Sequence, residues 1–338
     1  MATMLSPAEW VLLSGLAIGL AFGAGANLSG FCLHRGLNEA WAGRASPRLG
    51  AFAVALAVAL AGTQLLVLTD VVDTRRSLYL IPAVSWLLLP VGGLLFGYGM
   101  ALANGCGARA LVLLGQGNLR SLMVLLCLGI SAYMTLTGVL APIRSTLFDL
   151  TTLNLPWTTI SDPATRAVVV LAATGVLLFL ASQGKETRRR DWLGGALVGL
   201  LVVAGWFATG YLGNDDFDPA PVTSLTFVAP IGDSIHYAMI ATGMNLRFGI
   251  VIVIGVLIGS TLVTLVRRNG QLQGFDSPRH MVRSMTGGVL MGCGGALAYG
   301  CSIGQGLTGL STLSISSVVV TACIIAGSRL AWAASGNS

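Results

Sequence analysis

One glycine-rich sequence occurs twice in this chain, and the repeat restricts the possible folds more than any other feature. GGLLFGYGMALANGC at 92–106 and GGVLMGCGGALAYGC at 287–301 agree at ten of fifteen positions, with a constant offset of 195 residues. A shorter version of the pattern, FGAGANLSGFC, ends at Cys32. If the two copies cross a membrane in opposite directions, they form an inverted repeat. Such repeats place glycine-interrupted segments near the membrane midplane.

The amino-acid composition requires a membrane. With 54% hydrophobic residues, 9% charged residues and a mean hydropathy of +0.81, the chain lacks the polar surface of a soluble globule of 338 residues. We therefore predict an all-α integral membrane protein with nine transmembrane helices. The apolar stretches of spanning length lie at 10–26, 49–69, 84–103, 121–140, 166–183, 192–212, 246–266, 285–301 and 313–333. No basic residue precedes the first stretch, so we expect it to stay in the mature protein rather than act as a signal peptide.

The distribution of Lys and Arg predicts the orientation. Thirteen of them lie in the alternate segments 34–48, 104–120, 184–191 and 267–284, and three lie in the other loops. Because cytoplasmic loops carry an excess of basic residues, the N-terminus is predicted outside and the C-terminus in the cytoplasm. Topology alone accounts for the net charge of +6, so no nucleic-acid partner is expected.

These patterns together predict two inverted halves. Residues 1–140 form the first half, 141–191 a connector helix with a basic cytoplasmic loop, and 192–338 the second half. A single connector helix reverses the second half, so the charge distribution and the repeat independently require inversion.

The repeat motifs end in predicted helix breaks. ANGCGAR at 103–109 and AYGCSIGQGLTGLSTLS at 298–314 are rich in glycine, and such backbone survives at membrane depth only inside protein or beside a wet cavity. A helix that restarts after a break directs its partly positive N-terminus into the gap, which favours an anion. We assign Gly105, Gly107 and Gly300 to the site, and the earlier glycines of the motif to close helix packing.

The six cysteines separate by position. Those that end equivalent motifs at helix breaks are predicted to function, and those inside uniform apolar helices are predicted to pack as small hydrophobes. The functional group is Cys32, Cys106 and Cys301, the packing group is Cys127 and Cys323, and Cys293 lies between the two groups.

The sequence also bears on two other kinds of site, a metal site and a thiol active site. Cys32 and His34 form a C-x-H pair, but the chain has three histidines and no CxxC motif, so neither a metal nor a cofactor is expected. A membrane-embedded thiol enzyme or sulfur-relay subunit, working with a cytoplasmic persulfide carrier, is the alternative to a transporter. In that case Arg109 or a helix N-terminus would lower the pKa of Cys106.

The segments GFCLHRG, NGCGAR followed by GQGNLRSL, and GCSIGQGLTGLSTLS resemble the YeeE/YedE family of sulfur-compound transporters. The resemblance implies an hourglass-shaped bacterial inner-membrane protein with a periplasmic N-terminus, whose short loops meet at the waist. Cysteine thiols there would pass thiosulfate, or a similar small sulfur-containing anion, from periplasm to cytoplasm. A cytoplasmic sulfur-carrier (TusA-like) protein is a further possible partner, beside the lipid bilayer.

Residue by residue, the resemblance places Cys106 and Cys301 in the family's GC loops and Cys32 in its first-half RFC-type loop, with Gly30 in place of the arginine. The second-half RFC-type loop reads Arg247, Phe248, Gly249 and lacks the cysteine. The predicted substrate site is completed by the flanking Asn104 and Arg109, and by the candidate replacements Arg247, Gln305 and Cys293.

Overall fold

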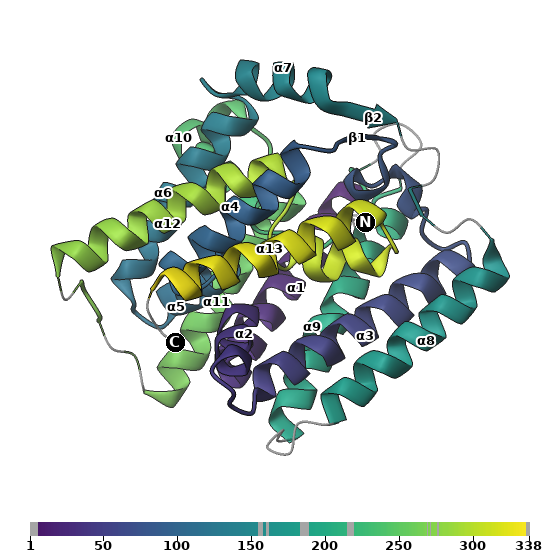
Figure 1. Ribbon diagram of the computed structural model, residues 1–338, viewed down its shortest axis with the longest axis horizontal. Coiled ribbons are helices and arrows are strands. Elements are labelled where there is room, and N and C mark those ends of the chain that lie inside the picture. The colour runs from purple at the N-terminus through teal and green to yellow at the C-terminus, as the bar shows by residue number, and fades with distance from the viewer. Residues whose placement is uncertain are drawn as a thin grey trace, which may run out of the picture.

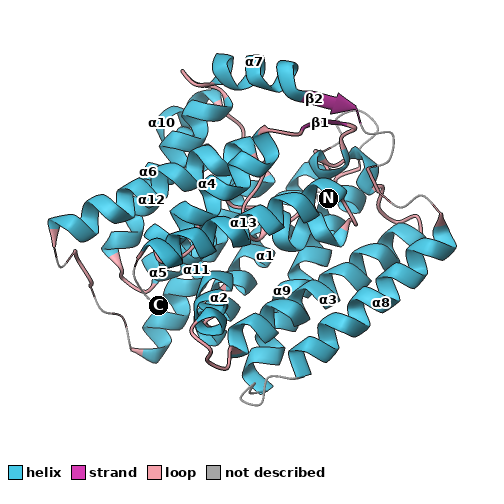
Figure 2. Ribbon diagram, viewed as in Figure 1, coloured by secondary structure: helices cyan, strands magenta, loops and turns pink. Residues whose placement is uncertain are grey.

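The computed structural model describes residues 6–154, 158–159, 162–182, 189–214, 220–268, 270, 272–275 and 277–335. This part of the chain is almost entirely helical, with one small pair of strands, β1 (Ala83–Ser85) and β2 (Thr152–Asn154), that run antiparallel (Figures 1 and 2). The α-helices are α1 (Pro7–Ser29), α2 (Leu33–Trp41), α3 (Pro47–Leu68), α4 (Leu88–Leu102), α5 (Gly107–Gly115), α6 (Leu119–Leu136), α7 (Ala141–Thr151), α8 (Pro163–Ser182), α9 (Arg189–Phe207), α10 (Val228–Ile240), α11 (Phe248–Arg267), α12 (Pro278–Leu297) and α13 (Ile315–Ala334). Two π-helical segments, η3 (Ala208–Leu212) and η5 (Gly304–Gly309), follow α9 and precede α13.

Within the described residues, eight helical segments are long and apolar enough to cross a membrane. They confirm an all-α membrane protein and coincide with eight of the nine predicted spans. The ninth prediction, 285–301, overlaps α12. This helix has 20 residues, but its first turns carry Arg279, His280 and Arg283, and it is not among the eight.

Two of the spans are interrupted where the sequence predicted breaks. The first passes from α1 to α2 through Gly30, whose φ of 68° ends α1. The third passes from α4 to α5 through Asn104 and Gly105, which have φ values of 57° and 154°. The short helices α2 and α5 are therefore half-helices that begin inside the protein.

Helices α4 and α12, which carry the two copies of the repeat, pack antiparallel at their glycines. A Cβ added at Gly92 would lie 2.7 Å from the carbonyl oxygen of Gly294, and one added at Gly99 would lie 2.6 Å from that of Gly287. The offset of 195 makes Gly287 the counterpart of Gly92, and Gly294 the counterpart of Gly99. Each glycine therefore contacts the counterpart of the other, as expected across a two-fold axis.

The other main helix pairs follow the same rule: each contact between the halves has an equivalent contact in which the two partners are swapped for their counterparts. Helix α1 packs on α11 as α9 packs on α3, and α4 packs on α13 as α12 packs on α6. Helix α8 lies outside this scheme, at the edge of the molecule against α3 (Figure 1). We propose that residues 1–140 and 192–338 are inverted halves joined by residues 141–191, and the exchanged contacts support this division.

Cys127 and Cys323 occupy equivalent places in these contacts. A Cβ added at Gly288 would lie 2.9 Å from Cβ of Cys127, and one added at Gly93 would lie 2.8 Å from Cβ of Cys323. Each cysteine thus fills the space opposite a repeat glycine, which supports a packing role for both.

Candidate functional site

Cys106 lies at the break between α4 and α5. The backbone N–H of Gly105 donates to the carbonyl oxygen of Met100 at 2.9 Å, which ends α4, and Cys106 is then the N-cap of α5. Gly105 is required here for two reasons. Its φ of 154° lies in the region that favours glycine, and a Cβ would lie 2.6 Å from Cδ of Arg109.

Cys301 occupies the matching break after α12. The N–H of Gly300 donates to the carbonyl oxygen of Gly295 at 2.9 Å, and Tyr299 has a φ of 54°, like its counterpart Asn104. The Sγ atom of Cys301 accepts a hydrogen bond from the N–H of Gly304, the first residue of η5, at 3.2 Å. The side chain of Cys301 is buried.

Cys32 is the N-cap of α2, directly after the break that ends α1. Cys32 and Cys106 are therefore the N-caps of short helices, and Cys301 lies three residues before η5. Backbone N–H groups at such positions lack intrahelical partners, and the helix dipole is positive there, so these thiols lie where an anion is stabilised.

Cys106 is the central member of this cysteine cluster, which we define as Cys32, Cys106 and Cys301. It has both other thiols and Ser302 as close electrostatic neighbours. The buried hydroxyl of Ser302 is a hydrogen-bonding neighbour of the Cys106 thiol. A polar ligand that passes between Cys106 and Cys301 would therefore have this hydroxyl beside it.

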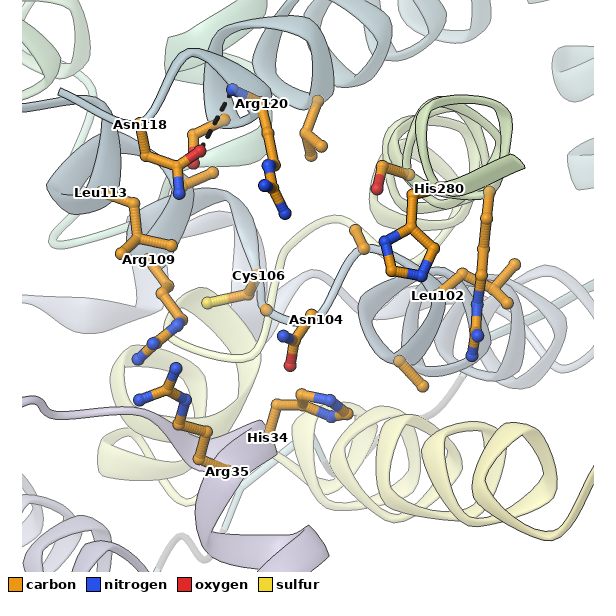
Figure 3. A pocket seen from close by; sticks show the side chains of 18 of the residues that line it. His34, Arg35, Leu102, Asn104, Cys106, Arg109, Leu113, Asn118, Arg120 and His280 are labelled. Carbon is orange, nitrogen blue, oxygen red and sulfur yellow. Dashed lines mark hydrogen bonds between the residues drawn. The ribbon is translucent and has the colours of Figure 1, made fainter. Parts of the chain in front are cut away.

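Two cavities lie on one side of the cluster. A small one of about 140 Å³ is lined by Cys32, Cys106 and Ser302, together with Arg35 and Arg109. A larger one of about 750 Å³, which we call the vestibule, also reaches Cys106, Arg35 and Arg109 (Figure 3). Cys301 lines neither of these two cavities.

The vestibule is cationic. No acidic side chain of the described residues lines it. The basic and histidine side chains on its wall are Arg35, Arg109, Arg120, Arg267, Arg283, His34 and His280.

The surroundings of Cys301 are uncharged by comparison. Its neighbours include the hydroxyl of Thr226, the backbone of Phe227 and Gly304, and the phenol of Tyr79. A Cβ at Gly304 would lie 2.7 Å from Oγ1 of Thr226 and 3.2 Å from Oη of Tyr79, so the glycine lets both hydroxyls approach the thiol.

Several predicted site residues lie together in the structure. Asn104, Gly105, Cys106 and Arg109 line the vestibule, and Cys32 lies in the adjoining small cavity. Two predicted glycines are instead packed against protein. A Cβ at Gly107 would lie 3.0 Å from Cδ1 of Ile231, and a Cβ at Gly300 would lie 3.0 Å from Cγ of Gln305.

Gln305 forms hydrogen bonds across the helix break and lines neither of the two cavities. Its Nε2 donates to the carbonyl oxygen of Ala298 at 2.6 Å, and its Oε1 accepts from the hydroxyl of Ser317 at 2.6 Å. Both ends of this buried amide are thus bonded to protein, across the ends of α12 and α13. Cys293 also lies apart from the cluster, with its Sγ 4.0 Å from the carbonyl oxygen of Ser131 on α6.

The second-half loop contains Arg247, Phe248 and Gly249, and the structure shows why Gly249 is not a cysteine. Gly249 lies in the first turn of α11, where a Cβ would be 2.7 Å from Cγ of Pro230, so a cysteine there would collide with α10. The residue that precedes α10 as Cys32 precedes α2 is Phe227, its N-cap. Arg247 is exposed at the start of α11, outside both cavities, and its charge acts on Asp233.

Sequence reasoning missed Arg35, Ser302, Tyr79 and Thr226. Arg35 follows the Cys32–His34 pair directly, and this adjacency is a signal for it in the sequence. Ser302 follows Cys301 directly, and this adjacency was the available signal. Tyr79 lies in the short 3-10 helix Leu78–Leu80 and Thr226 in the loop before α10, and neither segment contains a repeat motif that points to them.

Comparisons with known proteins identify a family and related sequences. A family model described as sulphur transport matches residues 28–330. The chain is 24% identical over 323 residues to the thiosulfate transporter TsuA of Escherichia coli K12, which covers 88% of this chain and 87% of that protein. It is also 26% identical over 271 residues to the thiosulfate transporter TsuA of Spirochaeta thermophila, which covers 72% of this chain and 76% of that protein.

Proposed function

The chain belongs to the sulphur transport family, and on that premise we propose that it takes up thiosulfate or a similar small sulfur-containing anion. It is a multi-pass membrane transporter rather than an enzyme. The observation that carries the choice of substrate is the cysteine cluster. Cys32 and Cys106 are helix N-caps that line an arginine-containing cavity, and Cys301 accepts a hydrogen bond from the first N–H of η5.

We propose that the anion passes from Cys301 to Cys106 and then beside Cys32 into the vestibule. Thiosulfate is a dianion with a polarisable terminal sulfur, and a thiol is a weak hydrogen-bond donor to such an atom. Weak contacts in series let the ion leave each position as easily as it enters. The helix N-termini stabilise its charge throughout, and no bond is formed or broken.

The direct test is uptake of sulfur-labelled thiosulfate by cells whose other thiosulfate importers are deleted. Cells that express this protein should accumulate label above cells that carry an empty vector. Equal accumulation in the two strains, with the protein present in the membrane, would refute thiosulfate uptake.

We also propose that the protein lies in the bacterial inner membrane with its vestibule facing the cytoplasm. The excess of Lys and Arg in the loops on that side supports this orientation. A fluorescent protein fused after Ser335 should then fluoresce, and alkaline phosphatase inserted after Asn214 should be active. The opposite pair of results would reverse the proposed direction of transport.

Arg247 is proposed to attract the anion at the outer mouth. Arg247 is exposed at the start of α11, and its charge acts on Asp233. We expect Arg247→Ala to lower uptake mainly at low substrate concentration, by about twofold to fivefold, with little change at saturation. The rate measured against thiosulfate concentration tests this, and an unchanged half-saturation concentration would remove Arg247 from the path.

The proposed cytoplasmic partner is a sulfur-carrier (TusA-like) protein that receives the anion at the vestibule mouth. A cationic cavity of about 750 Å³ is much larger than one thiosulfate, which leaves room for part of a partner. Co-purification of the two proteins from membranes tests this, and failure to co-purify in the presence of thiosulfate would argue against it.

A further inference from the structure

The two halves share a backbone plan but differ in charge around the cysteines. The offset of 195 pairs Arg109 with Gly304, Arg120 with Ile315, and Arg283 with Leu88. Helices α2 and α10 begin with the same offset, which pairs Arg35 with Pro230. The fold itself therefore does not require arginine at these vestibule positions, and their charge calls for a separate explanation.

Arg35 and Arg109 form the innermost part of the vestibule. Each is the third residue of a half-helix, α2 and α5, and each lines both the vestibule and the small cavity. In Figure 3 their guanidinium groups point toward one another beside Cys106. The charge of Arg109 acts on Arg35, which places the two cations within electrostatic range.

This pair lacks a dedicated counter-charge. Among the described residues, the one carboxylate that acts on Arg35 is Glu39, and Glu39 forms an ion pair with Arg48. The Nε atom of Arg109 is buried and has no hydrogen-bond partner within the part of the chain that the structure describes. Two neighbouring guanidiniums with an unused buried donor are stabilised when an anion lies between them.

We propose that Arg35 and Arg109 form an anion clamp that binds a tetrahedral dianion next to Cys32 and Cys106. The proposal rests on the proposed function for its place on the transport path, and deepens it by separating two kinds of recognition. The clamp selects by charge and by oxygen geometry, because guanidinium groups bind oxyanions in a bidentate manner. The cysteine cluster, in contrast, selects for soft sulfur.

The clamp should consequently accept sulfate as well as thiosulfate. Sulfate has the same charge as thiosulfate and the same tetrahedral geometry about its central sulfur, but no terminal sulfur for the thiols to contact. We expect it to bind from the vestibule side and to compete with thiosulfate there.

Binding to the purified full-length protein tests the clamp. Titration calorimetry in detergent would use sodium sulfate and sodium thiosulfate, with sodium chloride at matched ionic strength as the reference. We expect saturable sulfate binding to the wild type, and a dissociation constant at least about tenfold higher in Arg35→Gln and in Arg109→Gln. Arg35 is exposed at the vestibule wall, so its variant stays testable if Arg109→Gln fails to fold.

Two further variants make the result specific. Arg44→Gln removes the same charge from a nearby exposed loop position that does not line the vestibule, and sulfate binding should change by less than about twofold. Cys106→Ser should weaken thiosulfate binding more than it changes sulfate binding, because the hydroxyl is a harder partner for sulfur.

Absence of saturable sulfate binding in the wild type would overturn the clamp. Equal weakening by Arg44→Gln, or wild-type affinity in Arg35→Gln, would do the same. Failure of the proposed function alone would give a different result: cells would take up no thiosulfate, while the purified protein would still bind sulfate through Arg35 and Arg109.

Discussion

We expect Cys106→Ala and Cys301→Ala each to reduce thiosulfate uptake to the level of cells without the protein. Cys106 neighbours both other thiols of the cluster, and Cys301 is the cluster member outside the two cavities. On the proposed path, removal of either thiol would leave a gap between Cys106 and Cys301 that no second thiol fills. Initial rates of labelled thiosulfate uptake, divided by the amount of protein in the membrane, measure the effect.

The matched controls are Cys127→Ala and Cys323→Ala, which should retain most of the uptake. These cysteines pack against Gly288 and Gly93, away from the cluster. Trimming any of the four side chains should cost about 1 kcal/mol of stability, so membrane levels should stay comparable. Similar losses in all four variants would mean that the cysteines act only in packing. Full activity of Cys106→Ser would show that a hydroxyl is sufficient and that soft sulfur contacts are not used.

The second large effect concerns folding. A Cβ added at Gly97 would lie 2.0 Å from the carbonyl oxygen of Ile324, and one added at Gly292 would lie 2.3 Å from that of Leu128. Backbone atoms of a packed helix cannot move aside as a flexible side chain can. We expect Gly97→Ala and Gly292→Ala to lose about 1–3 kcal/mol or more, and to lower the yield of folded protein sharply.

Gly175→Ala on α8 is the control for this substitution. No heavy atom lies within 4 Å of a Cβ added there, so alanine gains its helix preference, about 0.5–1 kcal/mol, without a clash. Thermal unfolding of the purified proteins in detergent should place Gly175→Ala at or above the wild type and the other two variants well below it. Wild-type stability of Gly97→Ala and Gly292→Ala would show that α4 and α12 separate more easily than the structure indicates.

The sequence predicted the features that depend on pattern. Apolar stretches identified the spanning helices, and the repeated GC ending identified Cys106 and Cys301 as equivalent positions at helix breaks. These signals are visible because hydropathy and glycine placement are local properties of the chain.

Features that depend on tertiary contacts between side chains were not predicted. Its place in a glycine-rich loop suggests that Gln305 binds substrate, but its amide forms hydrogen bonds with Ala298 and Ser317 across the break. Gly249 looks like a missing cysteine because Arg-Phe precedes it, yet Pro230 occupies the space. Arg35 was read as a topology signal because the orientation of a half-helix is set by tertiary packing, which one sequence does not reveal.

The exchanged contacts of α4 and α12 bear on how one mouth came to differ from the other. The same contacts would form between two identical half-length subunits inserted in opposite directions, as in a homodimer. In such a dimer both mouths would carry the same side chains, so arginines at one would appear at the other. Joining the two halves in one chain through α8 removes that constraint, because the residues of each half are then encoded separately and can differ. Arg109 can then stand on one side while its counterpart is Gly304. If residues 1–140 and 192–338 are inverted halves, as we propose, their fusion is the condition under which the two sides of this scaffold can carry different side chains.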